Sequence, residues 1–160
     1  MLPRTHMVLT VRCEEREFLV DAGFGGDGLV EPIAIDGGLQ EQGGVCYRVA
    51  TESALCVLQR QVAGRWEDLY AVLPDSVHPI DFEMANWFTS THPRSPFVLN
   101  VTAQRITNGT RHILRNLTYT VARGAEIASP REIPRAELVP LLRDVFGLDV
   151  PDDARFRALD

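Results

Sequence analysis

The chain has 160 residues, 45% of them hydrophobic, and carries a formal net charge of −6 at pH 7. The length is enough for a real hydrophobic core in one medium or two small domains. The acidic balance argues against a nucleic-acid partner, because phosphate binding relies on clustered positive charge. No apolar run approaches the roughly twenty residues of a membrane-spanning helix, so no membrane partner is expected.

The three cysteines, Cys13, Cys46 and Cys56, indicate neither a disulfide scaffold nor a zinc site. They are odd in number and lack the Cys-x-x-Cys spacing that zinc sites use. The first residues are too short and too polar a stretch for a signal peptide. We therefore expect a cytoplasmic protein that binds no metal.

The first predicted element is a hairpin that carries a histidine and an aspartate. Two apolar runs, at residues 7–11 and 18–20, flank a polar cluster, which predicts antiparallel strands with a turn near Glu14. His6 and Asp21 are fifteen residues apart, and with any loop of even length they lie on the same face.

How the hairpin closes decides how directly the two side chains meet. If Val11 pairs with Arg16 they face each other, and if Cys13 pairs with Arg16 they are diagonal neighbours. Their Cβ atoms are then roughly 4.5 to 8 Å apart in either case.

A carboxylate beside an imidazole is the orienting half of a catalytic triad. We expect Asp21 to bind Nδ1–H of His6 and to leave Nε2 facing outward as the base. The alternative is an ordinary strand histidine with a fortuitous neighbour. Glycines within residues 23–26 favour the catalytic interpretation, because they can present Phe24 on a tight bend beside the pair. The same run lacks the Lys and Ser/Thr of a phosphate-binding loop.

Further short strands follow. The pattern predicts them at residues 29–35, 45–50, 54–62 and 65–72, with glycine-containing turns between several of them. Five or six short strands at this spacing predict a β-barrel or a strongly curved sheet.

The strand pattern then breaks at prolines. Asp81 is placed to cap a short helix that ends by Pro93. A second hairpin is predicted from residues 97–106 and 110–121, because the intervening Asn108-Gly109 tolerates the positive φ of a type I′ turn.

The last predicted element is a helix over residues 134–146, ended by Gly147. Pro140 removes a backbone hydrogen bond inside it, so we expect a kink there or a helix that begins at Pro140.

A hydroxyl-rich loop at residues 89–97 separates the first predicted helix from the following strand. Such loops often bind ligands, although the same composition also serves ordinary helix caps. Cys13 is the one thiol near the first hairpin, but it lies at the turn end, several residues of roughly 3.3 Å each from His6. It cannot be the nucleophile that partners His6.

The chain closely resembles the arylamine N-acetyltransferase family over nearly its whole length. The resemblance rests on residues 4–9 (RTHMVL), 20–26 (VDAGFGG), 86–97 (NWFTSTHPRSPF) and 145–148 (VFGL), in matching order and spacing.

The resemblance implies an α+β fold of the papain-like cysteine-enzyme superfamily. An N-terminal helical bundle precedes an antiparallel β-barrel and a small C-terminal α/β lid in this family. We expect residues 1–90 to form the barrel domain with its connecting helix, and residues 91–160 to form the lid.

It also implies a reaction and a set of site residues. A Cys-His-Asp triad in the family takes an acetyl group from acetyl-CoA and passes it to an arylamine, arylhydroxylamine or hydrazine. His6 and Asp21 match the catalytic His and Asp. Five further residues match positions that line the cofactor and acceptor pocket: Thr5, Phe24, Gly25, Ser95 and Phe97.

One family motif is missing. The nucleophile belongs to an Arg-Gly-Gly-x-Cys segment well before the His, and this sequence contains no such segment. We therefore expect the barrel and lid without the bundle, a chain inactive by itself, and association with a separate helical segment or with itself. Two alternatives stay open: a non-catalytic module that binds coenzyme A or an aromatic ligand, and a papain-like acyltransferase with a different acceptor.

Overall fold

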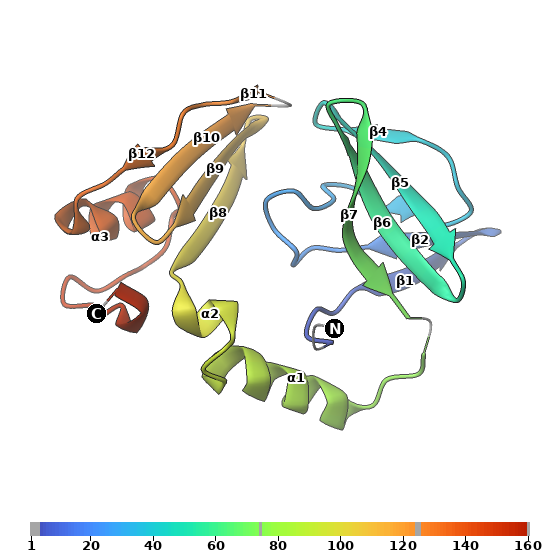
Figure 1. The fold of residues 1–160 in the computed structure, drawn as a ribbon, viewed down its shortest axis with the longest axis horizontal. Helices are drawn as coiled ribbons and strands as arrows, with labels where there is room; N and C mark the ends of the chain where they lie inside the picture. The colour runs from blue at the N-terminus through green and yellow to red at the C-terminus, as the bar shows by residue number, and fades with distance from the viewer. Residues whose placement is uncertain (1–3, 74, 124–125, 160) are drawn as a thin grey trace. The chain divides into compact units, whose positions relative to one another are not determined.

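The computed structural model describes residues 4–73, 75–123 and 126–159. It divides into two compact units. The first unit is His6–His78, and the second begins at Pro79 and also takes in residues 4 and 5. Figure 1 shows the order of the helices and strands in each unit.

The first sheet of the first unit is three-stranded and antiparallel, with the order β1-β2-β3. Its strands are β1 (Leu9–Cys13), β2 (Arg16–Val20) and β3 (Ile33–Ala34). β1 and β2 form the predicted hairpin, which closes with Cys13 opposite Arg16. Glu14 in the turn has a φ of 55°. The turn position is confirmed, and the register is the one that makes His6 and Asp21 diagonal neighbours.

The second sheet of this unit is a four-stranded meander with the order β4-β5-β6-β7. Its strands are β4 (Gln40–Gln42), β5 (Val45–Glu52), β6 (Leu55–Val62) and β7 (Arg65–Val72). The strands predicted at 45–50, 54–62 and 65–72 are confirmed. Gly43, Gly44 and Gly64 have positive φ at the tight turns, which only glycine adopts without steric cost.

The two sheets share one core. Leu19 and Ile33 of the first sheet cluster with Tyr47, Val49 and Leu58 of the second, and all five are buried. Each sheet therefore turns one apolar face toward the other, as the period-two alternation of strand side chains allows.

The predicted closed barrel is wrong. The strands form separate sheets, and within the described residues no pairing joins β3 to β4 or β7 to β1. A barrel needs its hydrogen-bond ladder to continue around the whole ring. The run at 29–35 supplies only two strand residues, because the amides of Val30 and Glu31 donate to the side chain of Gln42 instead of to a strand.

The second unit begins with two helices, α1 (Pro79–Thr91) and α2 (Pro96–Leu99). Asp81 lies in the first turn of α1 rather than at its cap, and the helix ends before Pro93 as predicted. The strand predicted from Phe97 is wrong at its start. Ser95 instead caps α2 by accepting from the amide of Phe97, and Pro96 occupies the first turn, where proline is well tolerated.

A five-stranded sheet follows, with the path β11-β10-β9-β8 and with β12 also paired to β10. Its strands are β8 (Thr102–Thr107), β9 (Thr110–Arg115), β10 (Thr118–Arg123), β11 (Glu126–Ile127) and β12 (Arg131–Glu132). The hairpin at Asn108-Gly109 is confirmed. The single strand predicted at 110–121 is two strands, which turn at Asn116 with a φ of 55°.

The sheet of the second unit packs against α3 (Arg135–Asp144), which lies beside β9, β10 and β12 (Figure 1). Their shared core is apolar and contains Leu114, Ile133, Leu138, Leu142 and Phe146. A short 3-10 helix, η1 (Arg157–Leu159), follows near the end of the chain.

The bounds of α3 exclude one of the two predictions made for Pro140. The helix begins at Arg135 and contains Pro140, so a start at Pro140 is wrong. Gly147 has a φ of 69°, and its amide donates to Arg143 O at 3.0 Å. The predicted glycine stop is confirmed. In the described part of the chain, no helix is both long enough and apolar enough to cross a membrane.

Candidate active site

His6 and Asp21 form a hydrogen-bonded pair at the open end of the first hairpin. Nε2 of His6 lies 2.8 Å from Oδ2 of Asp21. Because Leu9 pairs with Val20, the two side chains are diagonal across the strands, as expected. The histidine side chain is 32% exposed and that of the aspartate 0%, so a buried carboxylate holds an accessible imidazole.

The ring nitrogen that meets the carboxylate is not the expected one. We predicted that Asp21 would bind Nδ1 and leave Nε2 outward, and this is wrong: Nε2 is bound. The imidazole reaches along the strand to a diagonal partner, and Nε2 is the ring nitrogen farther from the backbone. Nδ1 is therefore the ring nitrogen that Asp21 does not bind.

The second oxygen of Asp21 is bound by the loop that follows. Oδ1 accepts the amides of Gly23 at 3.0 Å and Phe24 at 3.1 Å. Burial disfavours the charged carboxylate, but the bonds from His6 and Gly23 and the nearby Tyr70 hydroxyl outweigh it and hold the pKa of Asp21 below its ordinary value. Asp21 is therefore ionised at neutral pH and accepts a hydrogen bond from His6.

Two aromatic rings, those of Phe24 and Tyr70, flank the imidazole of this pair. The centroid of His6 lies 5.4 Å from that of Phe24 and 5.3 Å from that of Tyr70, both edge to face, and the Phe24 and Tyr70 centroids are 4.9 Å apart. These distances lie in the favourable range for aromatic pairs. The rings fix the imidazole from two sides and give the site an apolar wall.

Tyr70 also acts on Asp21 electrostatically. Its hydroxyl oxygen is buried and makes no hydrogen bond of good geometry within the described residues. Burial, together with the nearby Asp21 carboxylate, raises the pKa of Tyr70 well above its ordinary value. We regard the hydroxyl as a neutral donor dipole close to the carboxylate, in a contact looser than a full hydrogen bond.

The predicted bend of the glycine-rich loop is confirmed at Gly25 and Gly26, which have positive φ, whereas Gly23 does not. Gly28 N donates to Gly25 O at 2.6 Å. A Cβ on Gly28 would lie 2.9 Å from Gly25 O, closer than such atoms approach, and 3.1 Å from Phe24 Cβ, which is a tight contact. Gly28 is thus the glycine that lets the Phe24 side chain pack tightly.

The other predicted pocket residues lie in the second unit. Thr5 is half-buried and directly precedes His6 in the chain. Ser95 is fully buried; its hydroxyl donates to Thr89 O at 2.6 Å and accepts from the Phe97 amide. Phe97 is exposed on α2. The structure unites His6, Asp21, Phe24 and Gly25 in the first unit, and the pocket roles of the other three stay predictions.

The cysteines lie elsewhere on the first unit. Cys13 is exposed at the turn end of the hairpin, and Cys46 and Cys56 are partly exposed on β5 and β6. Within residues 4–73, 75–123 and 126–159, no group of three or more His, Cys, Asp or Glu side chains is arranged to hold a metal ion.

Sequence reasoning missed two residues of the site. Tyr70 lies in the predicted strand at residues 65–72, and no local pattern links it to Asp21, 49 positions earlier, because their contact is tertiary. Gly28 could have been noticed as one more glycine in the loop, but its need for close approach is visible only in three dimensions.

Comparison with known proteins gives a consistent result. A model of the N-acetyltransferase family matches residues 1–155. The arylamine N-acetyltransferase of Mycolicibacterium smegmatis is 33% identical over 152 residues, which are 93% of this chain and 55% of that protein. That of Mycobacterium tuberculosis is also 33% identical, over 99% of this chain and 57% of its own length.

Solved structures agree with the sequence comparison. The arylamine N-acetyltransferase of Salmonella typhimurium superposes with a TM-score of 0.86 at 27% identity, over 95% of this chain and 57% of that one. The Mycobacterium marinum enzyme in complex with CoA gives 0.83 at 30% identity, over 89% and 54%. The chain thus spans a little more than half the length of its relatives, and it belongs to the arylamine N-acetyltransferase family.

Proposed function

We propose that this chain supplies the His-Asp part of an acetyl-CoA-dependent arylamine N-acetyltransferase site, with His6 as the base and Asp21 as its orienting carboxylate. The observation that carries the proposal is the 2.8 Å hydrogen bond between His6 Nε2 and the fully buried Asp21 side chain. A buried, ionised carboxylate stabilises the imidazolium that forms when the histidine takes a proton.

The proposed nucleophile is a cysteine thiol outside the sequence described, as the family resemblance implies. His6 would take the thiol proton at Nδ1, which gives a thiolate–imidazolium pair. The thiolate forms a bond to the acetyl carbon of acetyl-CoA, the bond from that carbon to the coenzyme A sulfur breaks, and His6 returns the proton to the departing sulfur.

In the second half reaction the acetyl group passes from the cysteine to the acceptor amine. The amine nitrogen of an arylamine or hydrazine attacks the acetyl-cysteine, His6 takes the amine proton, and the cysteine sulfur leaves. Phe24 and Tyr70 make an apolar wall beside the imidazole, where an aromatic acceptor ring is expected to bind. We propose Phe24 and Gly25, together with Thr5, Ser95 and Phe97, as the residues of the cofactor and acceptor pocket.

The test supplies the missing nucleophile from a relative. The chain is co-purified with the part of the M. smegmatis enzyme that it does not match, and acetylation of aniline by acetyl-CoA is followed. We expect turnover only with both parts present, and a loss of several orders of magnitude on His6→Ala. His78→Ala changes an exposed histidine of the same unit and serves as the matched control.

Two results would contradict the proposal. Turnover of the combined parts that survives His6→Ala would remove His6 as the base. Turnover by this chain alone that His6→Ala abolishes would show that the nucleophile lies within residues 1–160. Binding of coenzyme A in calorimetry, without acetylation by the combined parts, would favour the non-catalytic binding module instead.

A further inference from the structure

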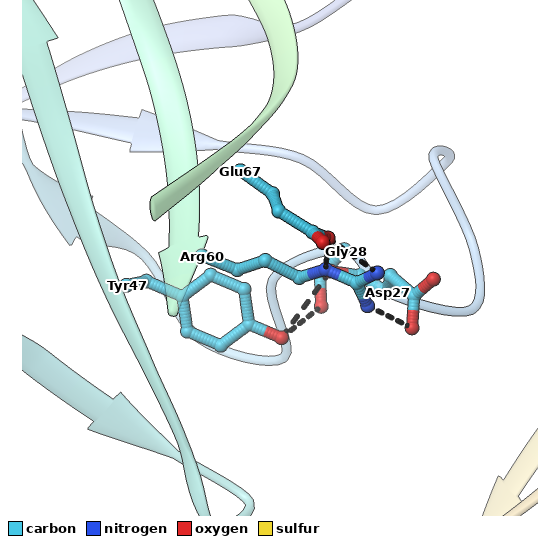
Figure 2. A network of polar contacts seen from close by, with 5 residues as sticks. All are labelled: Asp27, Gly28, Tyr47, Arg60 and Glu67. Carbon is cyan, nitrogen blue, oxygen red and sulfur yellow. Dashed lines mark hydrogen bonds and ion pairs between the residues drawn. The ribbon is translucent and has the colours of Figure 1, made fainter. Parts of the chain in front are cut away.

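A row of three side chains crosses the second sheet on one face. Tyr47 of β5 lies opposite Arg60 of β6, and Arg60 lies opposite Glu67 of β7. Directly opposed residues of antiparallel strands point to the same face. The three side chains therefore form one cross-strand row, drawn in Figure 2.

This row binds the loop that follows Asp21. The Tyr47 hydroxyl donates to the backbone oxygens of Asp27 at 3.2 Å and Gly28 at 3.4 Å. Nη1 of Arg60 lies 2.6 Å from Oδ1 of Asp27, while its Nη2 lies 3.1 Å from Oε2 of Glu67. Figure 2 shows the Arg60 guanidinium between the carboxylates of Glu67 and Asp27.

The burial of these groups makes the attachment specific. Tyr47 is 2% exposed and the Arg60 side chain 24%. An exposed ion pair alone would contribute little, but here a buried tyrosine binds the backbone of the loop and a partly buried arginine side chain binds the adjacent Asp27 carboxylate. Glu67 holds the guanidinium from the other side, so Arg60 is oriented before it meets Asp27.

Gly28 connects this row to the aromatic rings of the candidate active site through Phe24. Gly28 N donates a hydrogen bond to Gly25 O. A Cβ at Gly28 would lie only 3.1 Å from Phe24 Cβ and 3.2 Å from Phe24 Cδ1, so Gly28 and Phe24 pack closely. The Phe24 ring in turn contacts His6 and Tyr70. The position of the Phe24 ring thus depends on where the sheet holds Asp27 and Gly28.

We propose that Tyr47 and Arg60 are positioning residues that hold the Asp27-Gly28 segment so that the Phe24 ring rests against His6. They act through Phe24 and contact no reacting group. The functional meaning rests on the proposed function, in which Phe24 lines the acceptor pocket, whereas the attachment itself can be tested without any activity.

The test is nuclear magnetic resonance on the whole chain. We expect nuclear Overhauser effects between the Phe24 and His6 rings, and an upfield Gly28 α-proton in the ring current of Phe24. Arg60→Met and Tyr47→Phe should each abolish the inter-ring effects and return the Gly28 proton toward its ordinary shift. Arg60→Lys keeps a positive charge beside Asp27 and should retain part of both signals that Arg60→Met loses.

The matched control is Arg16→Met. Arg16 forms a bidentate ion pair with Asp36 in the same unit and takes no part in the row of Tyr47, Arg60 and Glu67. It should leave both signals unchanged. Signals that persist in Arg60→Met and Tyr47→Phe would overturn the proposal, and Tyr47→Phe keeps it testable if Arg60→Met does not fold. Signals lost here while His6→Ala leaves acetyl transfer intact would instead remove the proposed function and keep the attachment.

Discussion

Gly28→Ala tests how tightly the glycine-rich loop of the candidate active site is packed. The new Cβ would meet Gly25 O at 2.9 Å, Phe24 Cβ at 3.1 Å and Phe24 Cδ1 at 3.2 Å. Two of these three atoms are backbone or the first side-chain carbon, so relief requires the backbone to move. Overpacking of this kind costs about 1 to 3 kcal/mol, and the lower entropy of the unfolded alanine chain offsets about 0.4 to 1 kcal/mol of it. We expect a net loss of about 1 to 2 kcal/mol in the free energy of unfolding.

Gly23→Ala is the matched control for that substitution. It lies in the same loop, and neither glycine has a positive φ. Its Cβ would meet His6 Cε1 at 3.7 Å and Asp21 Oδ1 at 4.0 Å, which are ordinary contacts. We expect no loss of stability, or a gain of up to about 1 kcal/mol.

Urea unfolding measures the difference between the two variants. The chain has two tryptophans, and Trp66 lies in the first unit while Trp87 lies in the second. In a Trp87→Phe background, fluorescence therefore reports the first unit alone. With a slope of roughly 2 kcal/mol per molar urea, the Gly28→Ala midpoint should fall by about 0.5 to 1 M. Equal midpoints for the two variants would refute the packing argument.

Three further substitutions have effects that follow from charge or backbone conformation. Because the pKa of Asp21 is lower in the folded than in the unfolded chain, its ionised carboxylate stabilises the fold above the unfolded pKa of about 3.9. This stabilisation is lost as the pH falls through the folded pKa. The difference in Tm between the parent and Asp21→Asn should therefore shrink below about pH 4. The raised pKa of Tyr70 has its effect at alkaline pH. Above about pH 10 the tyrosine ionises in the unfolded chain but not in the folded one, so the parent should lose stability relative to Tyr70→Phe. A difference in stability between the two proteins that stays constant with pH would contradict this prediction. Gly147→Ala places a side chain at a φ of 69° and should cost the second unit about 1 to 2 kcal/mol, measured by Trp87 fluorescence in a Trp66→Phe background.

The predictions that succeeded depend on short-range rules. The β1–β2 hairpin follows from two apolar runs and a polar turn, and the diagonal approach of His6 and Asp21 follows from the alternation of side chains along paired strands. The glycine stop of α3 depends only on the left-handed conformation at Gly147. Such features need no knowledge of the rest of the fold.

The predictions that failed depend on long-range competition for backbone groups. The run at 29–35 has the composition of a strand, yet Gln42 takes the amides of Val30 and Glu31 from twelve and eleven positions away. Phe97 has strand propensity, but Ser95 and Pro96 start a helix there. Tyr70 contacts the His6 ring from another sheet. A local pattern contains none of these contacts.

The choice of imidazole nitrogen shows most clearly what the geometry adds to the sequence. With Nε2 bound to Asp21, a nucleophile that uses His6 as its base would have to meet Nδ1, the nitrogen next to the ring carbon that carries the side-chain stem. It would therefore approach close to the backbone at His6, whereas a base acting through Nε2 could reach farther out. Cys13 lies at the opposite end of β1. If His6 is the base, the hydrogen bond that orients its ring therefore requires the thiol to lie beside residue 6 and away from the hairpin turn.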